Sequence, residues 1–380
     1  KGEFMRIAMP TIWFHRGQTE VTKTFKKVFE ELGHEVFIHA RMGGVYNQPK
    51  LEFKRHRWED GKTLYYGEYN LSVAHSDGSI SSDFLEEIKE QKIDLVFFNE
   101  EYDWNLVGLV KSQGFKVATY LDFLHKNWIK NPSPLAIYDL VVCSTKRAYE
   151  MCKNISKAKW VGWGMDIEKI RVEYPWKNRP YLFFENAGWL GINDRKGMSS
   201  LLEIYQKLLN EFPEIFGSML IHTQLVLPVA NSKTEQEKID HQYRGVDVMG
   251  GSMNLPGLYH MAQVYCYPAK LDGLGLSLLE AMVNGLAIIC PDAPPWNEFV
   301  TNEVNGFLIP IIESLSRERE DGIVFKEVFI DQQKFLEAMI ELYKNENKRF
   351  SMGQNSIRVA EEKLNWNKFK ERIKECLEEL

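Results

Sequence analysis

Three charged residues stand where they could bind a phosphorylated, hydroxyl-rich ligand. The adjacent cations Arg195 and Lys196 end a long loop that follows an apolar segment, and Glu280 lies in a largely apolar stretch farther along the chain. Guanidinium and ammonium groups pair with phosphate oxygens, whereas a carboxylate accepts hydrogen bonds from a ribose diol. These groups suit a nucleoside diphosphate, although two adjacent cations are also common at the exposed start of a helix.

The loop and helix around Glu280 carry local signals of their own. Residues 272–275 read Asp-Gly-Leu-Gly, and two glycines this close allow positive φ angles or a close approach to a ligand. Ser277 and Glu280 have the spacing of a capping box, and Gly285 stands where a helix C-terminus favours a left-handed residue. We therefore predict a short helix whose first amides are free to face an anion.

Glu280 needs a partner, because apolar residues occupy most of the predicted helix and stranding a charge there is costly. One possible partner is the start of its own helix, as in a capping box. The other is a hydroxyl group of a ligand in a cleft, with a phosphate beside it. The residues by themselves leave both partners open.

Parallel sheets in two α/β domains would position these side chains. Strand, helix and strand alternate at residues 6–10, 21–32 and 35–40, which predicts a βαβ unit. Residues 41–80 read as irregular, and the chain after residue 310 reads as helical. Further strands are predicted at 94–98, 116–120, 140–143, 181–185, 218–223, 264–267, 286–290 and 307–310, with a strand and turn at 160–166. Further helices are predicted at 83–91, 104–113, 198–211, 258–262 and 277–284.

A change of composition to Pro, Lys and Asn at residues 172–180 indicates a linker. We expect one domain at residues 5–172, a second at 173–355, and a C-terminal helix at 356–380 that packs back on the first domain. Because both domains belong to the same α/β class, we expect a cleft between their two sheets.

Three residues of the first domain lie at strand ends. Gly17 follows the first strand and Asp122 directly follows strand 116–120, so both stand at the sheet edge where α/β proteins bind ligands. Each would also be unremarkable as a turn residue. Ser144 is a plausible N-cap of the next helix.

Net charge, the length of apolar runs and the cysteine spacing disfavour several classes of protein. A net charge of -6 argues against nucleic acid as the main partner, and no apolar run is long enough for a membrane span. The five cysteines form no C-x-x-C pair, which disfavours a zinc site or a disulfide framework and fits a reducing cytoplasm. A basic and aromatic run at residues 54–58 would suit an anionic acceptor or a membrane surface, or be a solvated face.

Several motifs with known mechanisms are missing. The sequence has no P-loop, no H-E-x-x-H, no G-x-S-x-G and no D-x-D pair. These absences disfavour a P-loop NTPase, a zinc hydrolase, a serine hydrolase and a transferase that anchors its donor through a D-x-D metal site.

Residues 272–282, DGLGLSLLEAM, resemble the E-G-F-G-L-P-L-L-E-A-M signature of GT4-type retaining glycosyltransferases, including the E-x7-E spacing of its acids. The resemblance covers about residues 142–310 and includes Ser144, the Gly-Met-Asp at 164–166 and the Lys-Gly at 196–197. It implies a GT-B architecture of two Rossmann-like domains, with the acceptor on the first and the donor on the second. The implied reaction moves a sugar from a nucleoside diphosphate sugar to a carbohydrate or lipid-linked hydroxyl, with retention and without a metal or other cofactor, in the cytoplasm or at the membrane surface.

The resemblance also implies roles for single residues. Glu280 would bind the ribose hydroxyls and Asp272 the hydroxyls of the donor sugar, while Lys196 and Arg195 would neutralise the leaving diphosphate. Four more positions in the second domain would contact the donor, and in the first domain Gly17 would approach the diphosphate and the acceptor. The four positions are Gly273, Gly275, Leu276 and Ser277.

The sequence departs from that family at three places. Asp272 is one methylene shorter than the usual glutamate, and Gly188-Trp189 replaces the usual Gly-Arg, which leaves Arg195 as the substitute cation. Asp122 stands where many members carry a histidine with a catalytic role. A non-catalytic nucleotide-sugar-binding subunit, or an epimerase or phosphorylase of the same architecture, is therefore the alternative.

Overall fold

The computed structural model describes residues 4–13, 17–41, 56–57, 61–66, 79–101, 103–122, 133–155, 157–188, 194–223, 244–251, 253, 255–318 and 324–380. The basic and aromatic run at 54–58 lies largely outside these residues, and so does Trp189.

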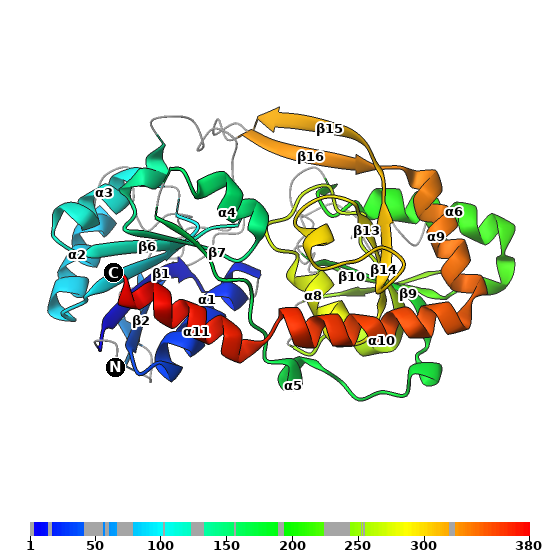
Figure 1. Ribbon diagram of the computed structural model, residues 1–380, viewed down its shortest axis with the longest axis horizontal. Helices are drawn as coiled ribbons and strands as arrows, with labels where there is room; N and C mark the ends of the chain where they lie inside the picture. The colour runs from blue at the N-terminus through cyan, green and yellow to red at the C-terminus, as the bar shows by residue number, and fades with distance from the viewer. Residues whose placement is uncertain are drawn as a thin grey trace. The chain divides into compact units, whose positions relative to one another are not determined.

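The chain forms two compact units (Figure 1), one of residues 1–164 and 366–380 and the other of residues 165–365. The units divide at 164/165 and 365/366, whereas the predicted domains divide at 172/173 and 355/356. Val172, the first residue of the predicted linker, already bonds to the end of α8 (Leu276–Val283) in the second unit, since Val172 N donates to Asn284 Oδ1 at 3.0 Å. The boundary predicted at 355/356 falls inside the continuous helix α10 (Glu346–Lys363).

An eight-stranded sheet forms the centre of the first unit, in the order β3-β4-β2-β1-β5-β6-β7-β8. Every neighbouring pair is parallel except β3 with β4. Because β4 pairs with β2, the prediction that residues 41–80 are irregular is wrong at that point. The strands are β1 (Arg6–Ile12), β2 (Glu35–Arg41), β3 (His56–Arg57), β4 (Thr63–Tyr66), β5 (Leu95–Asn99), β6 (Lys116–Tyr120), β7 (Leu140–Cys143) and β8 (Ala158–Trp160).

Helices cover this sheet and close its core. The ring of Phe25 on α1 lies 4.9 Å from that of Phe97 on β5 and 5.7 Å from that of Phe369 on α11. The C-terminal helix thus supplies an aromatic side chain to the core of the first unit. The helices of this unit are α1 (Gly17–Glu31), α2 (Ser79–Glu90), α3 (Trp104–Ser112), α4 (Lys146–Cys152) and α11 (Trp366–Glu378).

A six-stranded sheet forms the second unit, in the order β11-β10-β9-β12-β13-β14, and all of its neighbouring pairs are parallel. The predicted second parallel sheet is therefore confirmed. A 3-10 turn, η6 (Tyr259–Met261), replaces the helix predicted at 258–262. The other elements are β9 (Tyr181–Gly188), β10 (Met219–Thr223), β11 (Val246–Gly250), β12 (Ala262–Cys266), β13 (Ala287–Pro291), β14 (Gly306–Ile309), α5 (Ile167–Ile170), α6 (Met198–Glu211), α8 (Leu276–Val283), α9 (Gln332–Lys344) and α10.

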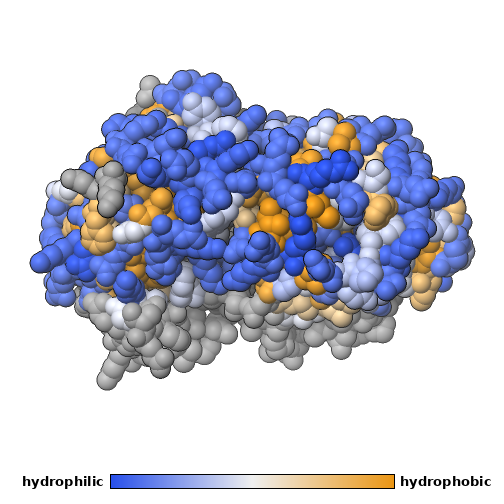
Figure 2. All heavy atoms as spheres, turned by 60° about the horizontal axis from the view of Figure 1, so that its bottom comes forward, coloured by the Kyte–Doolittle hydropathy of each residue, from blue (hydrophilic) through white to orange (hydrophobic). Residues whose placement is uncertain are grey.

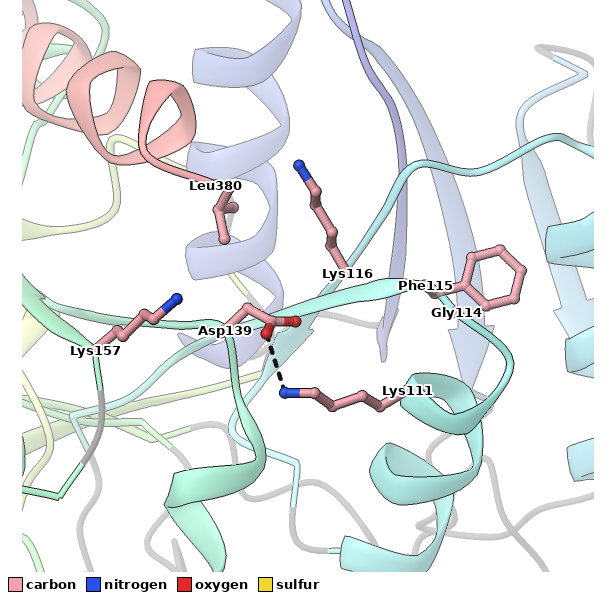
Figure 3. Close-up of a pocket in the computed structure, with 7 residues that line it drawn as sticks. All are labelled: Lys111, Gly114, Phe115, Lys116, Asp139, Lys157 and Leu380. Carbon is pink, nitrogen blue, oxygen red and sulfur yellow. Dashed lines mark hydrogen bonds and ion pairs between the residues drawn. The ribbon is translucent and has the colours of Figure 1, made fainter.

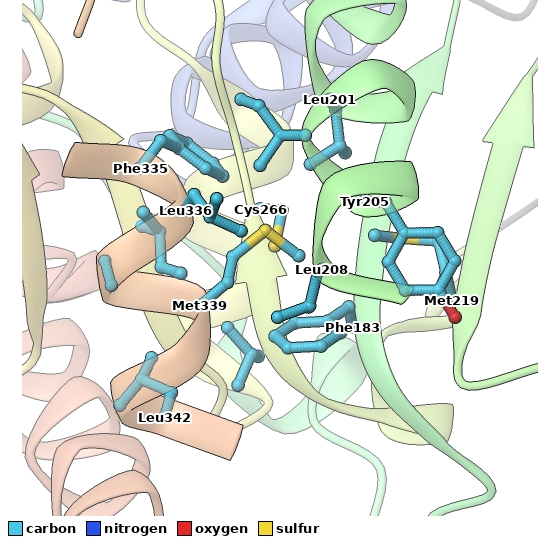
Figure 4. Packing of buried hydrophobic residues seen from close by; sticks show 14 of the residues in the cluster. Phe183, Leu201, Tyr205, Leu208, Met219, Cys266, Phe335, Leu336, Met339 and Leu342 are labelled. Atoms are coloured by element: carbon cyan, nitrogen blue, oxygen red, sulfur yellow. The ribbon is translucent and has the colours of Figure 1, made fainter. Parts of the chain in front are cut away.

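The core of the second unit lies between α6, α9 and the sheet. Leu201 and Leu208 of α6 point toward Met339 of α9 and Phe183 of β9, and all four are fully buried (Figure 4). The apolar period of residues 198–211 predicted α6 correctly because one face of that helix packs in this core.

An antiparallel hairpin of β15 (Ile311–Glu318) and β16 (Val324–Ile330) follows the second sheet. The prediction that this segment is helical is wrong. Nearly all of β15 is exposed, so its side chains do not alternate between apolar and polar as those of a half-buried strand do. Val328 N donates to Lys270 O at 2.9 Å, which joins the hairpin to the loop before α8.

In the view of Figure 2, hydrophilic side chains cover most of the described surface, and hydrophobic ones appear in separate groups between them. Phe4, Phe216 and Ile312 are among the exposed large apolar residues, and they come from distant parts of the chain. Scattered apolar side chains of this kind are normal for a folded surface.

Candidate functional site

Two loops meet at the carboxyl ends of β9 and β12 in the second unit. Lys270 N and Leu271 N both donate to Arg195 O, at 2.8 Å and 3.3 Å. Gly197 has a φ of 78°, and a Cβ atom there would lie 2.1 Å from Pro268 O. Because no side chain fits at this point, glycine allows the backbone of one loop to lie against that of the other.

The contact between these loops brings Lys196, Asp272 and Tyr267 into one buried cluster. Lys196 Nζ forms an ion pair with Asp272 Oδ2, and Tyr267 OH donates to the same oxygen. Arg195 NH1 lies 3.7 Å from Asp272 Oδ1. The structure thus brings together three residues predicted from the sequence, and it adds Tyr267, whose phenol ring is fully buried below the Lys196 ammonium.

The cations control the ionisation of the aspartate. Burial by itself would raise the pKa of Asp272, but Lys196 and Arg195 offset it and hold that pKa well below its ordinary value. Burial lowers the pKa of Lys196, an effect that contact with Asp272 opposes. The site therefore carries an ionised aspartate whose negative charge is balanced by neighbouring cations.

Glu185 lies near this cluster on β9 and was not predicted. Its side chain is fully buried, and neither carboxylate oxygen has a hydrogen-bond partner among the described residues. Burial, with the nearby charge of Asp194, raises its pKa well above the ordinary value, against the opposing effect of Lys196. Glu185 is therefore a buried carboxyl group in the sheet beside the cluster, and its surroundings disfavour its charged form. Its only sequence signal is an acidic residue at the end of an apolar run, YLFFE.

Helix α8 begins beside the cluster with a left-handed glycine. Gly275 is the N-cap with a φ of 85°, and no side chain caps the helix. The capping box predicted for Ser277 and Glu280 is therefore wrong, because the N-cap is Gly275, two residues before the position of Ser277 that this spacing needs. Within the described residues, the amides of Leu276 and Ser277 donate to no protein acceptor. These amides remain available to an anion.

Glu280 faces a tyrosine instead of the start of its helix. Tyr259 OH donates to Glu280 Oε2, and Asn186 Nδ2 donates to Tyr259 OH at 2.7 Å. The C-terminus of α8 follows the prediction, since Gly285 has a φ of 71° and its amide donates to Met282 O at 3.0 Å.

The remaining predicted residues are placed in both units. Gly273 N donates to Asp272 Oδ1 at 2.9 Å, so this glycine supports the aspartate through its backbone. In the first unit, Gly17 is the first residue of α1 and is exposed. The donor-site roles of both glycines stay predictions.

The carboxylate of Asp122, in the first unit, accepts hydrogen bonds from neutral donors, while the Arg147 guanidinium donates to its backbone carbonyl at 2.8 Å. Tyr120 OH donates to Asp122 Oδ2 at 2.5 Å, Ser144 Oγ donates to the same oxygen, and Thr145 donates to Oδ1 through its amide at 3.1 Å and its hydroxyl at 2.9 Å. Burial raises the pKa of Asp122 to about 7. These bonds tie β6 to the start of α4, and the catalytic role of Asp122 stays a prediction. The N-cap of α4 is Thr145, so the cap predicted at Ser144 is wrong.

A separate hollow of about 310 Å³ lies on the first unit (Figure 3). Lys111 donates to Asp139 Oδ1 at 3.0 Å within it, while Lys116 and Lys157 are exposed. None of the residues predicted to bind the donor lines this hollow. Among the described residues, no helix is long and apolar enough to cross a membrane, and no group of three or more His, Cys, Asp or Glu side chains could hold a metal ion.

Part of the chain is similar to known proteins. Residues 191–313 match the family model of glycosyl transferases group 1, and this segment includes both loops and α8. A UDP-N-acetylglucosamine–peptide N-acetylglucosaminyltransferase GtfA subunit of Streptococcus agalactiae is 44% identical over 61 residues, 16% of this chain and 12% of that protein. An uncharacterized glycosyltransferase of Haemophilus influenzae is 27% identical over 120 residues, 30% of this chain and 31% of that protein. These alignments span less than a third of each curated relative.

Solved structures resemble the whole chain. HepE of Anabaena, in complex with UDP and glucose, has a TM-score of 0.72 at 13% identity, with 99% of this chain and 100% of that chain covered. The fold is GT-B. The pneumococcal O-GlcNAc transferase GtfA, in complex with UDP and GlcNAc, has a TM-score of 0.66 at 16% identity, with 99% of each chain covered. The predicted GT-B fold class is confirmed.

Proposed function

We propose that this chain is a retaining, GT4-type glycosyltransferase that moves a sugar from a nucleoside diphosphate sugar to a hydroxyl of a carbohydrate or lipid-linked acceptor. The observation that carries the proposal is the cluster of Lys196, Arg195 and Asp272 beside the free amides of Leu276 and Ser277. Cations and oriented amides at one place favour a diphosphate, and the group 1 family match covers the same residues.

The reaction separates charge, and these groups would stabilise it. The bond between the sugar C1 and the β-phosphate oxygen breaks, and its electron pair leaves with the diphosphate. An acceptor hydroxyl oxygen forms the new bond to C1, and its proton passes to an oxygen of the departing diphosphate. Lys196, Arg195 and the amides at the start of α8 would stabilise the departing diphosphate, because preorganised positive groups act most strongly where charge develops.

The two acids would bind hydroxyl groups of the donor. Asp272 is ionised and would accept hydrogen bonds from the sugar, and Glu280 from the ribose. For Asp272 to do so, a ligand must take over part of its pairing with Lys196. The diphosphate provides this exchange, since it presents new negative charge to the same ammonium group.

The absence of a D-x-D motif supports metal-independent transfer, and the cysteines support a cytoplasmic location. The cations would take the place of a metal ion at the diphosphate, so transfer would be metal-independent. All five cysteines are buried free thiols, as suits a protein that works in the reducing cytoplasm, where it would meet its acceptor in solution or at the membrane surface.

Thermal shift with UDP-, GDP- and ADP-sugars tests the donor site. A ligand at 100 times its Kd adds about 2.7 kcal/mol of stability, so a true donor raises the Tm clearly. The donor that shifts the Tm is then incubated without acceptor, and slow release of free sugar is expected. NMR spectra of the transfer product, the glycoside of the acceptor, should show retention of the anomeric configuration. Absence of any shift would overturn the proposal.

The second candidate is a non-catalytic subunit that binds a nucleotide sugar. It is favoured by the ion pair of Lys196 with Asp272, which already neutralises the cation meant for the diphosphate. A Tm shift without donor hydrolysis, and without transfer to any acceptor, would support this candidate over the enzyme.

A further inference from the structure

A chain of hydrogen bonds runs from the second sheet to Glu280 on α8. His222 Nδ1 lies 3.0 Å from Asn186 Oδ1, Asn186 Nδ2 donates to Tyr259 OH at 2.7 Å, and Tyr259 OH donates to Glu280 Oε2. The outer nitrogen of the imidazole, His222 Nε2, lies 2.9 Å from Gly251 O. The four side chains come from β10, β9, η6 and α8, so the chain joins four separate elements.

The directions of donation follow from the chemistry of each group. The hydroxyl of Tyr259 has one proton, and that proton goes to the Glu280 carboxylate. Tyr259 therefore accepts from the Asn186 amide. Asn186 Oδ1 and Gly251 O lie within hydrogen-bond distance of the two ring nitrogens of His222, and a neutral imidazole, with one N–H, donates to only one of them. The direction of donation is thus set from Asn186 through Tyr259 to Glu280.

Packing holds Tyr259 rigidly in place. Its side chain is 1% exposed, and its ring lies 5.4 Å from the ring of Phe184 and 5.9 Å from that of Tyr265. Because the ring is buried and packed, the Tyr259 hydroxyl has a defined position from which it donates to Glu280. Glu280 itself is partly exposed, and the bond from Tyr259 restricts the rotamers that its side chain can adopt.

We propose that Tyr259, held by the Asn186 amide, is a positioning residue that holds the Glu280 carboxylate in the orientation in which it accepts nucleotide ribose hydroxyls. The inference rests on the proposed function, since it assumes that Glu280 binds a ribose. It assigns to this site a specificity element for ribonucleotides over deoxyribonucleotides. Tyr259 lies outside the motif at residues 272–282 that contains Asp272 and Glu280.

Calorimetric titration of Tyr259→Phe with UDP, GDP and ADP and with their 2′-deoxy and 3′-deoxy counterparts tests the inference. The wild type is expected to bind one ribonucleotide more tightly than its deoxy forms. In Tyr259→Phe the ring stays and the hydroxyl is lost, so that preference should fall about threefold to tenfold while affinity for the deoxy forms stays unchanged. Asn186→Leu should shift the preference in the same direction by a smaller factor.

Tyr205→Phe is the matched control, because Tyr205 is also fully buried and its hydroxyl donates to Ile215 O at 2.9 Å, in a contact that involves none of the predicted donor-site residues. In the Glu280→Gln background, Tyr259→Phe should change the preference no further. An equal loss of affinity for ribo and deoxy forms, or an unchanged preference, would overturn the inference alone. Failure of the wild type to bind any of these nucleotides would overturn the proposed function and the inference with it.

Discussion

Two aspartates follow parallel strands, Asp272 after β12 and Asp122 after β6, yet they meet opposite partners. Asp272 faces Lys196 and Arg195, and its pKa lies below the ordinary value. Asp122 faces hydroxyl groups and an amide of Tyr120, Ser144 and Thr145, and burial raises its pKa to about 7.

The comparison shows that position at a strand end does not by itself decide the role of an acid. Asp272 stands in a balanced set of charges, which an anionic ligand can rearrange by replacing one partner with another. The Asp122 carboxylate accepts from neutral donors that tie β6 to α4, with the Arg147 guanidinium on its backbone carbonyl, and a ligand would have to break that connection to reach it. The first arrangement is suited to binding and the second to holding the fold.

Lys196→Ala should have the largest effect, because it removes the cation placed for the leaving diphosphate. We expect kcat to fall at least about tenfold, equal to about 1.4 kcal/mol of transition-state stabilisation. The measurement is steady-state transfer with the donor identified by thermal shift. Lys334→Ala, which removes an exposed lysine of α9, serves as the control and should leave kcat unchanged. Near-normal turnover in Lys196→Ala would remove this residue from the site.

Asp272→Asn should separate the two roles assigned to the cluster. Loss of the negative charge frees Lys196 for the diphosphate, so the nucleoside diphosphate should bind severalfold more tightly, on the order of 1 kcal/mol. The same change removes the charged acceptor for the sugar hydroxyls, and kcat should decrease. Calorimetry with the diphosphate, together with initial rates, gives both quantities. Weaker diphosphate binding would show that Asp272 holds Lys196 in its productive position.

Asp122→Asn should change the pH dependence of stability in the first unit. The pKa of Asp122 is higher in the folded protein than its unfolded value of about 3.9, so the folded state holds its proton more firmly. Its contribution to the free energy of unfolding is therefore lost as the pH rises from about 4 through about 7. Urea unfolding curves should show a steeper decline for the wild type than for Asp122→Asn across this range. Parallel curves would contradict the raised pKa.

Removal of divalent ions should have the smallest effect. With cations in place of a metal at the diphosphate, EDTA should change the transfer rate by less than about twofold. A large loss of activity that added Mg²⁺ or Mn²⁺ restores would show that a metal binds the donor.

Much of the fold could be predicted from the sequence, because buried helices and strands produce strong apolar patterns. Residues 198–211 predict α6 since one of its faces packs in a core, and residues 286–290 predict β13 to within one residue because that strand is fully buried. The hairpin of β15 and β16 could not be predicted in the same way. Its first strand lies almost wholly in solvent, where side chains do not need to alternate.

The site was predictable only where a residue type implies its chemistry. Lys196 could be found from its charge and place in the chain, and Asp272 from the resemblance of its motif to that of a known family; the two residues do pair. Glu185 and Tyr259 could not, because an acid inside an apolar strand and a tyrosine near a turn give no sign of what they face. The partner of Glu280 depends on where η6 folds, which no local pattern encodes.

The contact at Gly197 has a consequence for how this site is encoded. A methyl group at residue 197 would overlap with Pro268 O. The distance between the opposite charges of Lys196 and Asp272 therefore depends on glycine at this position. Gly197→Ala would change no charge and remove no donor, but it would push the two loops apart. The electrostatics of the cluster thus depend on the absence of a Cβ atom at residue 197.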